Sequence, residues 1–192
     1  MSSITFEEAI ELSSKLLNHI ERGELETASA PEHIAEIVKD APGARGFLVA
    51  YLTGNSRIAE EHPKFVLTGL AQSEDLITGL ITKNLVMSSA MSVLHERNGN
   101  EQLLKESNKV VRRSVCLAQG MASKRLLNHF HQMLTAIKDE LNKQPDAPDF
   151  EAAEQPCNDQ HNYSFFLKRW KYDREQLSAA ENAVKSAIVS IS

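Results

Sequence analysis

Apolar side chains recur every three to four residues along most of the chain, which is the spacing of amphipathic α-helices. At the N-terminus, Thr5 and Glu8 form a capping box, and the apolar series behind them ends at Gly23. A second, short helix is predicted over 29–38, after which Pro42-Gly43 is expected to break the chain.

A continuous apolar run over 47–52 fits either a strand or a buried helix. A strand there would have no sheet partner, because no other segment alternates apolar and polar residues with a period of two. We therefore predict a helix over 44–53 that Gly54 ends, and another helix that begins near Pro63.

The most apolar stretch covers residues 76–94, of which 11 of 19 are apolar. It contains Lys83 and Asn84, and a membrane span needs about 20 predominantly apolar residues. Its apolar positions lie on nearly every side of a helix, which is typical of a helix surrounded by others. We predict a buried central helix over 74–97.

Two long helical segments are predicted after the central helix. Residues 101–142 contain no proline and fit one helix, with a kink near Gly120 where the apolar stripe changes face. Residues 163–190 fit a last helix that docks along the core through a seven-residue apolar spacing. The docking residues are Trp170, Leu177, Val184 and Ile191.

Residues 143–160 separate these two segments and differ from them in composition. They contain three prolines and five acidic side chains, with Lys143 as the one basic residue, which is typical of a linker. We predict an all-α bundle of about five to seven helices in a single domain. A helical core occupies 1–142, and the C-terminal helix within 161–192 packs on it.

The composition is that of a globular protein, with 192 residues, 42% hydrophobic and 24% charged. A net charge of −5 argues against long-range attraction of nucleic acid by the whole surface. The two cysteines, Cys116 and Cys157, make no disulfide framework, and the first residues lack the features of a signal peptide. We expect a cytoplasmic protein with no membrane partner.

Common catalytic and metal-binding motifs are missing from the sequence. It contains no glycine-rich phosphate loop, no His-Glu-x-x-His and no Cys-x-x-Cys, and none of its seven histidines follows a glutamate by three residues. Cys157 and His161 supply two ligands, whereas a zinc site needs three or four. We therefore expect neither a metal nor a cofactor.

One polar cluster has the residue types for chemistry. Arg125 and His129 are four residues apart on a predicted helix, and His131 follows. Histidine titrates near neutrality and arginine binds phosphate. The pair Arg125 and His131 resembles the motif of HEPN-type helical ribonucleases, which implies RNA cleavage by these residues. We favour a solvated helix face, because such pairs are common by chance.

A second cluster combines cations with aromatic rings. Its interaction candidates are Lys168, Arg169, Trp170, Lys171 and Tyr172, with Phe165, Phe166 and Arg174 beside them. Such mixtures suit anionic partners and protein interfaces. We favour Phe166 and Trp170 as core residues with the cations on the solvent side, because the heptad spacing explains both aromatics.

These observations favour a non-enzymatic helical interaction or scaffold protein, with a protein partner or a second copy of the chain as in a homodimer. Nucleic acid is a weaker candidate partner. One alternative is the helical ribonuclease or nucleotide-handling enzyme that Arg125, His129 and His131 would form. The other is a binder of a hydrophobic small molecule between helices, for which the candidate lining is Met87, Met91, Phe130 and Met133.

Overall fold

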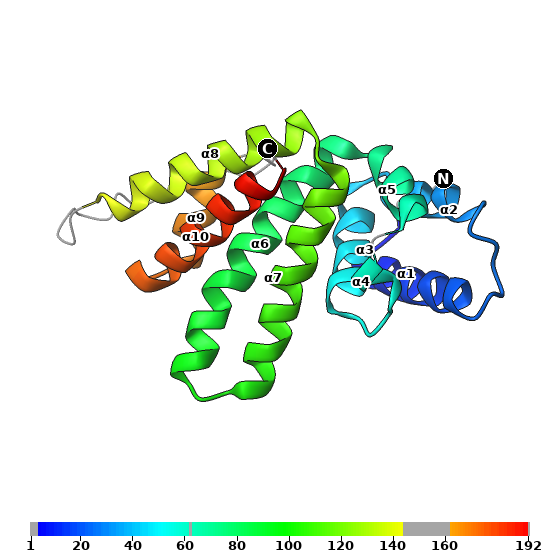
Figure 1. The fold of residues 1–192 in the computed structure, drawn as a ribbon, viewed down its shortest axis with the longest axis horizontal. Helices are drawn as coiled ribbons and strands as arrows, with labels where there is room; N and C mark the ends of the chain where they lie inside the picture. The colour runs from blue at the N-terminus through cyan, green and yellow to red at the C-terminus, as the bar shows by residue number, and fades with distance from the viewer. Residues whose placement is uncertain (1–3, 62, 144–161, 192) are drawn as a thin grey trace.

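The computed structural model describes residues 4–61, 63–143 and 162–191, which form ten α-helices and no strand (Figure 1). The predicted all-α class is confirmed, with a larger number of helices than five to seven. The helices are α1 Phe6–Glu21, α2 Ala30–Ile37, α3 Ala41–Thr53, α4 Ile58–Glu61, α5 Lys64–Ala71, α6 Glu74–Arg97, α7 Glu101–Met121, α8 Lys124–Leu141, α9 Tyr163–Trp170 and α10 Arg174–Ile191. Apart from Lys143, the predicted linker lies outside the described residues.

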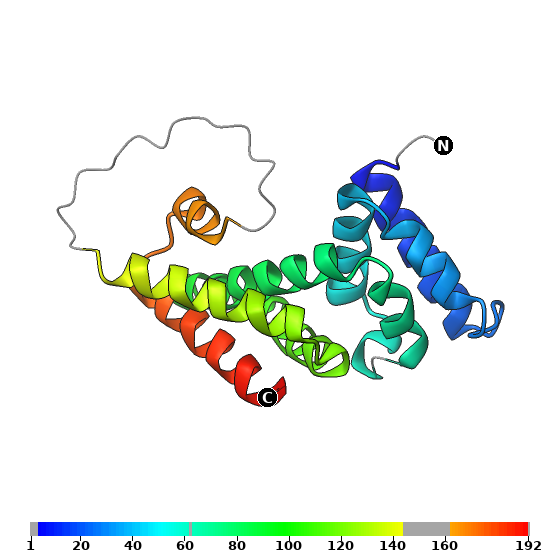
Figure 2. The same ribbon diagram turned by 90° about the horizontal axis from the view of Figure 1, so that it is seen from above.

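The first five helices form one end of the molecule, and α6 to α10 form the other (Figure 2). Buried side chains from both ends join in one hydrophobic cluster, in which Leu17, Phe47 and Ile81 are nearly or fully inaccessible. Helix α1 packs along α3, and its N-terminus has the predicted capping box of Thr5 and Glu8. Gly46 brings the two helices close together, because a Cβ atom there would lie 2.5 Å from Cβ of Ala9.

Helix α3 begins earlier than its apolar run suggests. The prediction that Pro42-Gly43 breaks the chain was wrong, because both residues lie in the first turn of α3. Proline is tolerated there, since the amide hydrogen that it lacks has no partner within the helix. The side chain of Asp40 caps the helix by accepting a hydrogen bond of 2.9 Å from the Gly43 amide. The helix ends before Gly54, as predicted.

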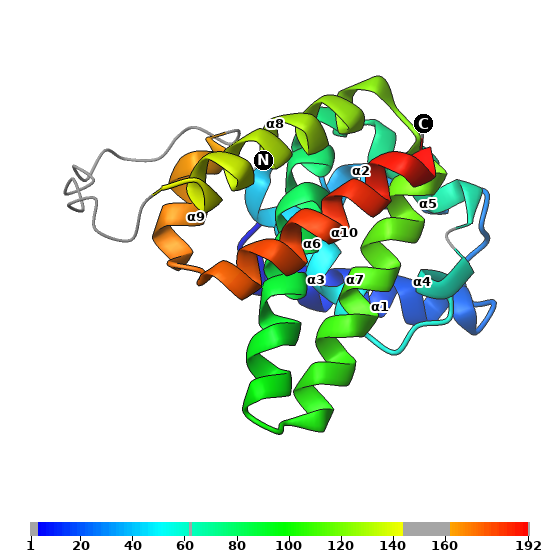
Figure 3. The same cartoon turned by 60° about the vertical axis from the view of Figure 1, so that its left-hand side comes forward.

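Helix α6 has the predicted bounds of the central helix. It packs against α7, α8 and α10, and α10 crosses the α6–α7 pair in Figure 3. It is the one helix among the described residues that is long and apolar enough to cross a membrane, and half of its most apolar window is buried inside the protein. Its packing among other helices accounts for that apolar composition.

The segment 101–142 forms two helices and not one. Helix α7 ends at Ala122, which adopts a left-handed conformation with φ of 37°. Ser123 then caps α8, where its hydroxyl accepts a hydrogen bond of 3.2 Å from the Leu126 amide. The sequence change near Gly120 therefore marks a turn between two helices, where a kink within one was predicted.

The C-terminal segment is also divided, at Lys171, where φ is 49°. Asp173 and Gln176 form a reciprocal cap at the start of α10, because each side chain accepts a hydrogen bond of 3.0 Å from the backbone amide of the other. Arg97, at the end of α6, donates hydrogen bonds to Asp173 and Glu175 and ties α10 to the central helix. These hydrogen bonds to Arg97 hold the pKa of Asp173 below its usual range.

A buried arginine joins the two ends of the molecule. Arg113 of α7 is 3% exposed, and its guanidinium donates to the carbonyl oxygens of Tyr51, Leu52 and Gly54 at 2.7–3.2 Å. It also donates to Glu60 of α4 at 2.9 Å. The hydrogen bond from Arg113 lowers the pKa of Glu60. The last turn of α3 thus receives its hydrogen-bond donors from a helix far along the chain.

Candidate interaction surface

Trp170 ends α9 and is 48% exposed, so the prediction that it docks in the core was wrong. Other members of the predicted apolar series do pack inward, since Leu177 and Val184 are 4% and 0% exposed. The division at Lys171 explains the difference, because a residue before the break no longer keeps the spacing of α10. The heptad interpretation therefore holds within α10 and fails at Trp170.

The indole of Trp170 stacks on the ring of Tyr172. The ring centroids are 6.3 Å apart and the planes differ by 6°. The left-handed backbone of Lys171, between the two residues, turns the chain so that both rings lie on the same side. The buried hydroxyl of Tyr172 has no hydrogen-bond partner in the part of the chain that the structure describes.

Cations accompany this stack on the last turn of α9 and the link to α10. Lys168, Arg169 and Lys171 are exposed, and none of them forms an ion pair within the described ranges. Arg174 donates to the carbonyl oxygen of Leu141 at 3.5 Å. We call residues 168–172 together with Arg174 the basic corner. It contains all five interaction candidates that the sequence predicted.

The two acidic side chains beside the basic corner already form ion pairs. Asp173 and Glu175 both pair with Arg97. The charge is also unevenly distributed along the chain, since residues 4–73 carry eleven acidic and six basic side chains. Residues 74–192 carry fifteen acidic and fifteen basic side chains. The net charge of −5 therefore comes from the first 73 residues, and the rest of the chain is balanced in charge.

Exposure of Trp170 predicts a particular quenching behaviour. Trp170 is the one tryptophan of the chain, so the intrinsic indole fluorescence reports on it alone. We expect red-shifted emission that iodide quenches more strongly than caesium at low ionic strength, because the neighbouring cations attract iodide. Added sodium chloride should reduce the difference. Emission typical of a buried indole, with equal quenching by both ions, would contradict the exposed corner.

Helix α9 is attached to the core on its other side by Tyr163, which is 3% exposed. The hydroxyl of Tyr163 lies 2.7 Å from Nδ1 of His129 on α8, and the two rings meet edge to face. Burial raises the pKa of Tyr163, and a hydrogen bond with Thr82 opposes that rise. Leu167, one turn further along, is also buried. The corner therefore projects from a helix whose apolar face is already packed.

Removal of the hydroxyl should have opposite effects on stability at the two tyrosines of this region. Tyr172→Phe should raise the free energy of unfolding by about 1 kcal/mol, because it removes a buried hydroxyl without a partner. Tyr163→Phe should lower it by about 1–2 kcal/mol, because it breaks the bond to His129 and leaves that ring nitrogen buried. Urea unfolding of both variants measures the difference. If Tyr172→Phe is the more damaging change, the Tyr172 hydroxyl has a partner.

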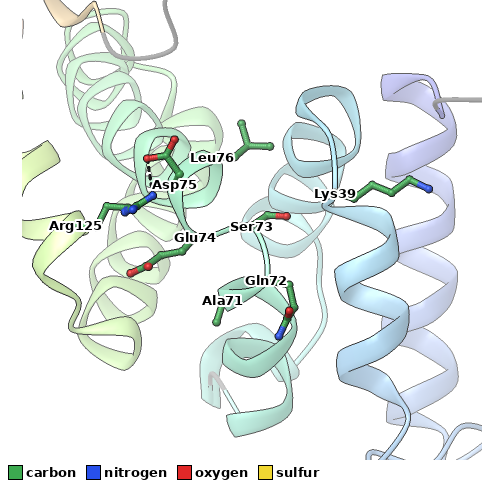
Figure 4. Close-up of a pocket in the computed structure, with 8 residues that line it drawn as sticks. All are labelled: Lys39, Ala71, Gln72, Ser73, Glu74, Asp75, Leu76 and Arg125. Atoms are coloured by element: carbon green, nitrogen blue, oxygen red, sulfur yellow. Dashed lines mark ion pairs between the residues drawn. The ribbon is translucent and has the colours of Figure 1, made fainter.

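The cluster of Arg125, His129 and His131 is not brought together in space. Arg125 is half exposed and pairs with Asp75 of α6 at 2.9 Å (Figure 4). His129 is 6% exposed against Tyr163, whereas His131 is exposed. His131 follows Arg125 by six positions, which places the two about 120° apart around the helix. The three side chains therefore face an acidic residue of α6, a tyrosine of α9 and solvent, respectively.

Arg125 lies beside an open surface pocket of about 380 Å³. The pocket is lined by the end of α5, by Ser73 and the first residues of α6, and by Lys39 after α2. In Figure 4 the Lys39 side chain points away from Arg125 and Asp75. The charged groups of Arg125 and Asp75 are directed at each other and form an ion pair.

The candidate lining of a hydrophobic ligand site is divided between α6 and α8. Phe130 and Met133 are fully buried, while Met87 and Met91 are half-buried on α6. Within the described ranges, no group of three or more histidine, cysteine, aspartate or glutamate side chains could hold a metal ion. Cys157 and His161 lie outside those ranges.

The sequence predicted the residues of the basic corner and the exposure of its cations, but not the exposure of Trp170. The signal that was overlooked is the Asp-x-x-Gln pattern at Asp173 and Gln176, which is typical of a helix start. A helix that begins at residue 174 places the preceding Trp170 and Tyr172 outside it. The parallel contact of the two rings follows from the backbone of Lys171, which no sequence pattern indicated.

Comparison with known proteins gives one match. A family model described as "Uncharacterised conserved protein UCP020893" matches residues 5–147, which is well over half of the chain. The match covers α1 to α8. No significant match is found among curated proteins or among solved structures.

Proposed function

The chain belongs to the family described as uncharacterised conserved protein UCP020893, and we propose that it is a cytoplasmic, non-enzymatic helical protein that binds a partner protein. The partner-binding surface in this proposal is the basic corner. The observation that carries it is the exposure of Trp170 together with three cations that lack ion pairs within the described residues.

The exposure of Trp170 lowers the stability of the unbound protein. A tryptophan that leaves half of its surface in water forgoes much of the hydrophobic stabilisation that burial gives. Tryptophan, tyrosine and arginine are also the residues that most often dominate the binding energy of protein interfaces. The corner contains all three, at the end of a helix that Tyr163 and Leu167 attach firmly to the core. A rigid aromatic anchor loses little conformational entropy on binding.

The experiment uses a photo-crosslinking amino acid in place of Lys171 in the full chain inside its native cell. A discrete cross-linked partner is expected, whereas the same amino acid in place of Lys105, exposed on α7, should give none. The identified partner is then purified and its affinity measured by calorimetry. A homodimer through the corner would appear as an adduct of two copies of the chain.

The calorimetry compares two variants of equal charge change. Lys168→Glu with Arg169→Glu alters the corner, and Lys64→Glu with Lys105→Glu alters two exposed cations elsewhere. Only the corner variant should weaken binding, by at least tenfold. If both variants bind the purified partner as the natural protein does, the basic corner is not the binding surface and the proposal is wrong.

A further inference from the structure

The chemistry of the basic corner points to the kind of segment that it binds. Four cations lie within residues 168–174, and the single tryptophan of the chain lies among them. We propose that the corner binds a short acidic peptide segment of a partner protein, and that an apolar side chain of this segment covers Trp170. This inference rests on the proposed function and adds the chemistry of the partner to it.

The charge of the molecule favours an acidic segment at this end. Residues 4–73 carry five more acidic than basic side chains, residues 74–192 carry equal numbers of both, and four cations are concentrated within 168–174. An acidic segment is therefore attracted to the corner and repelled by the end formed by α1 to α5. Asp173 and Glu175 repel it less than two unpaired carboxylates would, because both form ion pairs with Arg97.

Trp170 supplies an apolar contact in addition to the charges. One face of its indole lies against Tyr172, and 48% of the residue's surface remains exposed. A small acidic peptide without an apolar residue would leave that surface in water. An apolar side chain between the acidic residues covers the exposed indole and gains the hydrophobic free energy that the free protein lacks.

A nucleic-acid strand suits the corner less well. Single strands bind along grooves that offer successive aromatic rings and a row of phosphate contacts. The corner offers one aromatic stack, and Asp139 and Glu140 follow near the end of α8, which Arg174 contacts at Leu141. A strand that continues past the corner brings its phosphates toward these carboxylates, whereas a short peptide ends before them.

A lipid surface also suits the basic corner less well than an acidic peptide does. A helix that lies in a membrane interface needs a free apolar face. In α9 that face is already packed, since Tyr163 and Leu167 are 3% and 1% exposed and α9 lies against α8. The exposed residues of α9 are Ser164, Lys168, Arg169 and Trp170, so a single apolar side chain of this helix is exposed.

The test uses the full chain and a synthetic peptide of aspartate and glutamate residues around one central phenylalanine. Trp170 fluorescence reports binding directly, because neither the peptide nor the rest of the chain contains tryptophan. We expect a saturable blue shift, and an affinity that falls steeply as sodium chloride is added. Replacing the central phenylalanine by glycine should weaken binding severalfold, and the same peptide with lysines for its acids should not bind.

Matched variants and probes decide between the outcomes. Lys168→Glu with Arg169→Glu should weaken peptide binding at least tenfold, and Lys64→Glu with Lys105→Glu should leave it unchanged. Oligothymidylate and phosphatidylserine vesicles are titrated in parallel. The inference is overturned if either of them binds the corner more tightly than the acidic peptide, or if the peptide does not bind. A corner-dependent partner that this peptide fails to displace would overturn the inference and leave the proposed function standing.

Discussion

Arg113→Met is expected to lower the free energy of unfolding by about 3–5 kcal/mol, which is the usual cost of removing one member of a buried charged network. Methionine approximates the length of the side chain and fills its place, so the loss comes from polar contacts and not from a cavity. The carbonyl oxygens of Tyr51, Leu52 and Gly54 would remain without the donors that Arg113 gives them. Thermal unfolding followed by circular dichroism should show a midpoint roughly 6–20 °C lower.

The adjacent arginine is the control for this prediction. The side chain of Arg112 is 59% exposed, and its ion pair within the described part of the chain is with the same Glu60 at 3.2 Å. Exposed ion pairs contribute about 0–1 kcal/mol, so Arg112→Met should change stability little. Similar losses from both substitutions would mean that Arg113 does not join α7 to the end of α3. Retention of the helical signal at low temperature in both variants confirms that each still folds.

Gly46→Ala is expected to destabilise the protein by about 2–3 kcal/mol, although alanine favours a helix more than glycine does. The new Cβ atom would lie 2.5 Å from Cβ of Ala9 and 2.8 Å from the carbonyl oxygen of Phe6. Backbone atoms cannot move aside as a flexible side chain can, so α1 and α3 must separate along their contact. Urea unfolding measures the loss, and adding Ala9→Gly should restore part of it by removing the Cβ–Cβ clash.

Gly120→Ala in α7 is the control for Gly46→Ala in α3. A Cβ atom at Gly120 meets the end of the Leu67 side chain at 3.0 Å, and that side chain is able to rotate. The gain in helix propensity, about 0.5–1 kcal/mol, should offset the contact. Equal stability of Gly46→Ala and the natural protein would show that α1 and α3 do not approach as closely as described.

Local sequence patterns were sufficient for most helix bounds. The capping box at Thr5, the glycine after Thr53 and the apolar surroundings of α6 act within a few residues, so their effects can be read along the chain. The same patterns failed where a backbone turn depends on packing. Ala122 and Lys171 adopt left-handed conformations that neither residue type favours, and they divide two segments that periodicity predicts as single helices.

The sequence predicted which residues form the candidate surface, but it did not predict how they are arranged. The mixture of cations and aromatics over 168–172 is visible in the sequence, as is the absence of common catalytic motifs. Whether Trp170 is buried depends on where α10 begins and on how α9 lies against α8. The Arg125 cluster shows the same limit, because its partners Asp75 and Tyr163 come from other helices.

The all-α class and the central helix over 74–97 follow from the sequence, because helix formation and amphipathic burial depend on neighbours three or four residues away. The environments of Arg113, His129 and Trp170 follow from the packing of distant segments. Arg113 meets carbonyl groups 59–62 residues earlier in the chain, and His129 meets a tyrosine 34 residues later. A charged or aromatic side chain has the same intrinsic chemistry whether it is buried or exposed. Its burial and its hydrogen-bond partners, which decide whether it stabilises the fold or faces a partner, arise only when those segments meet.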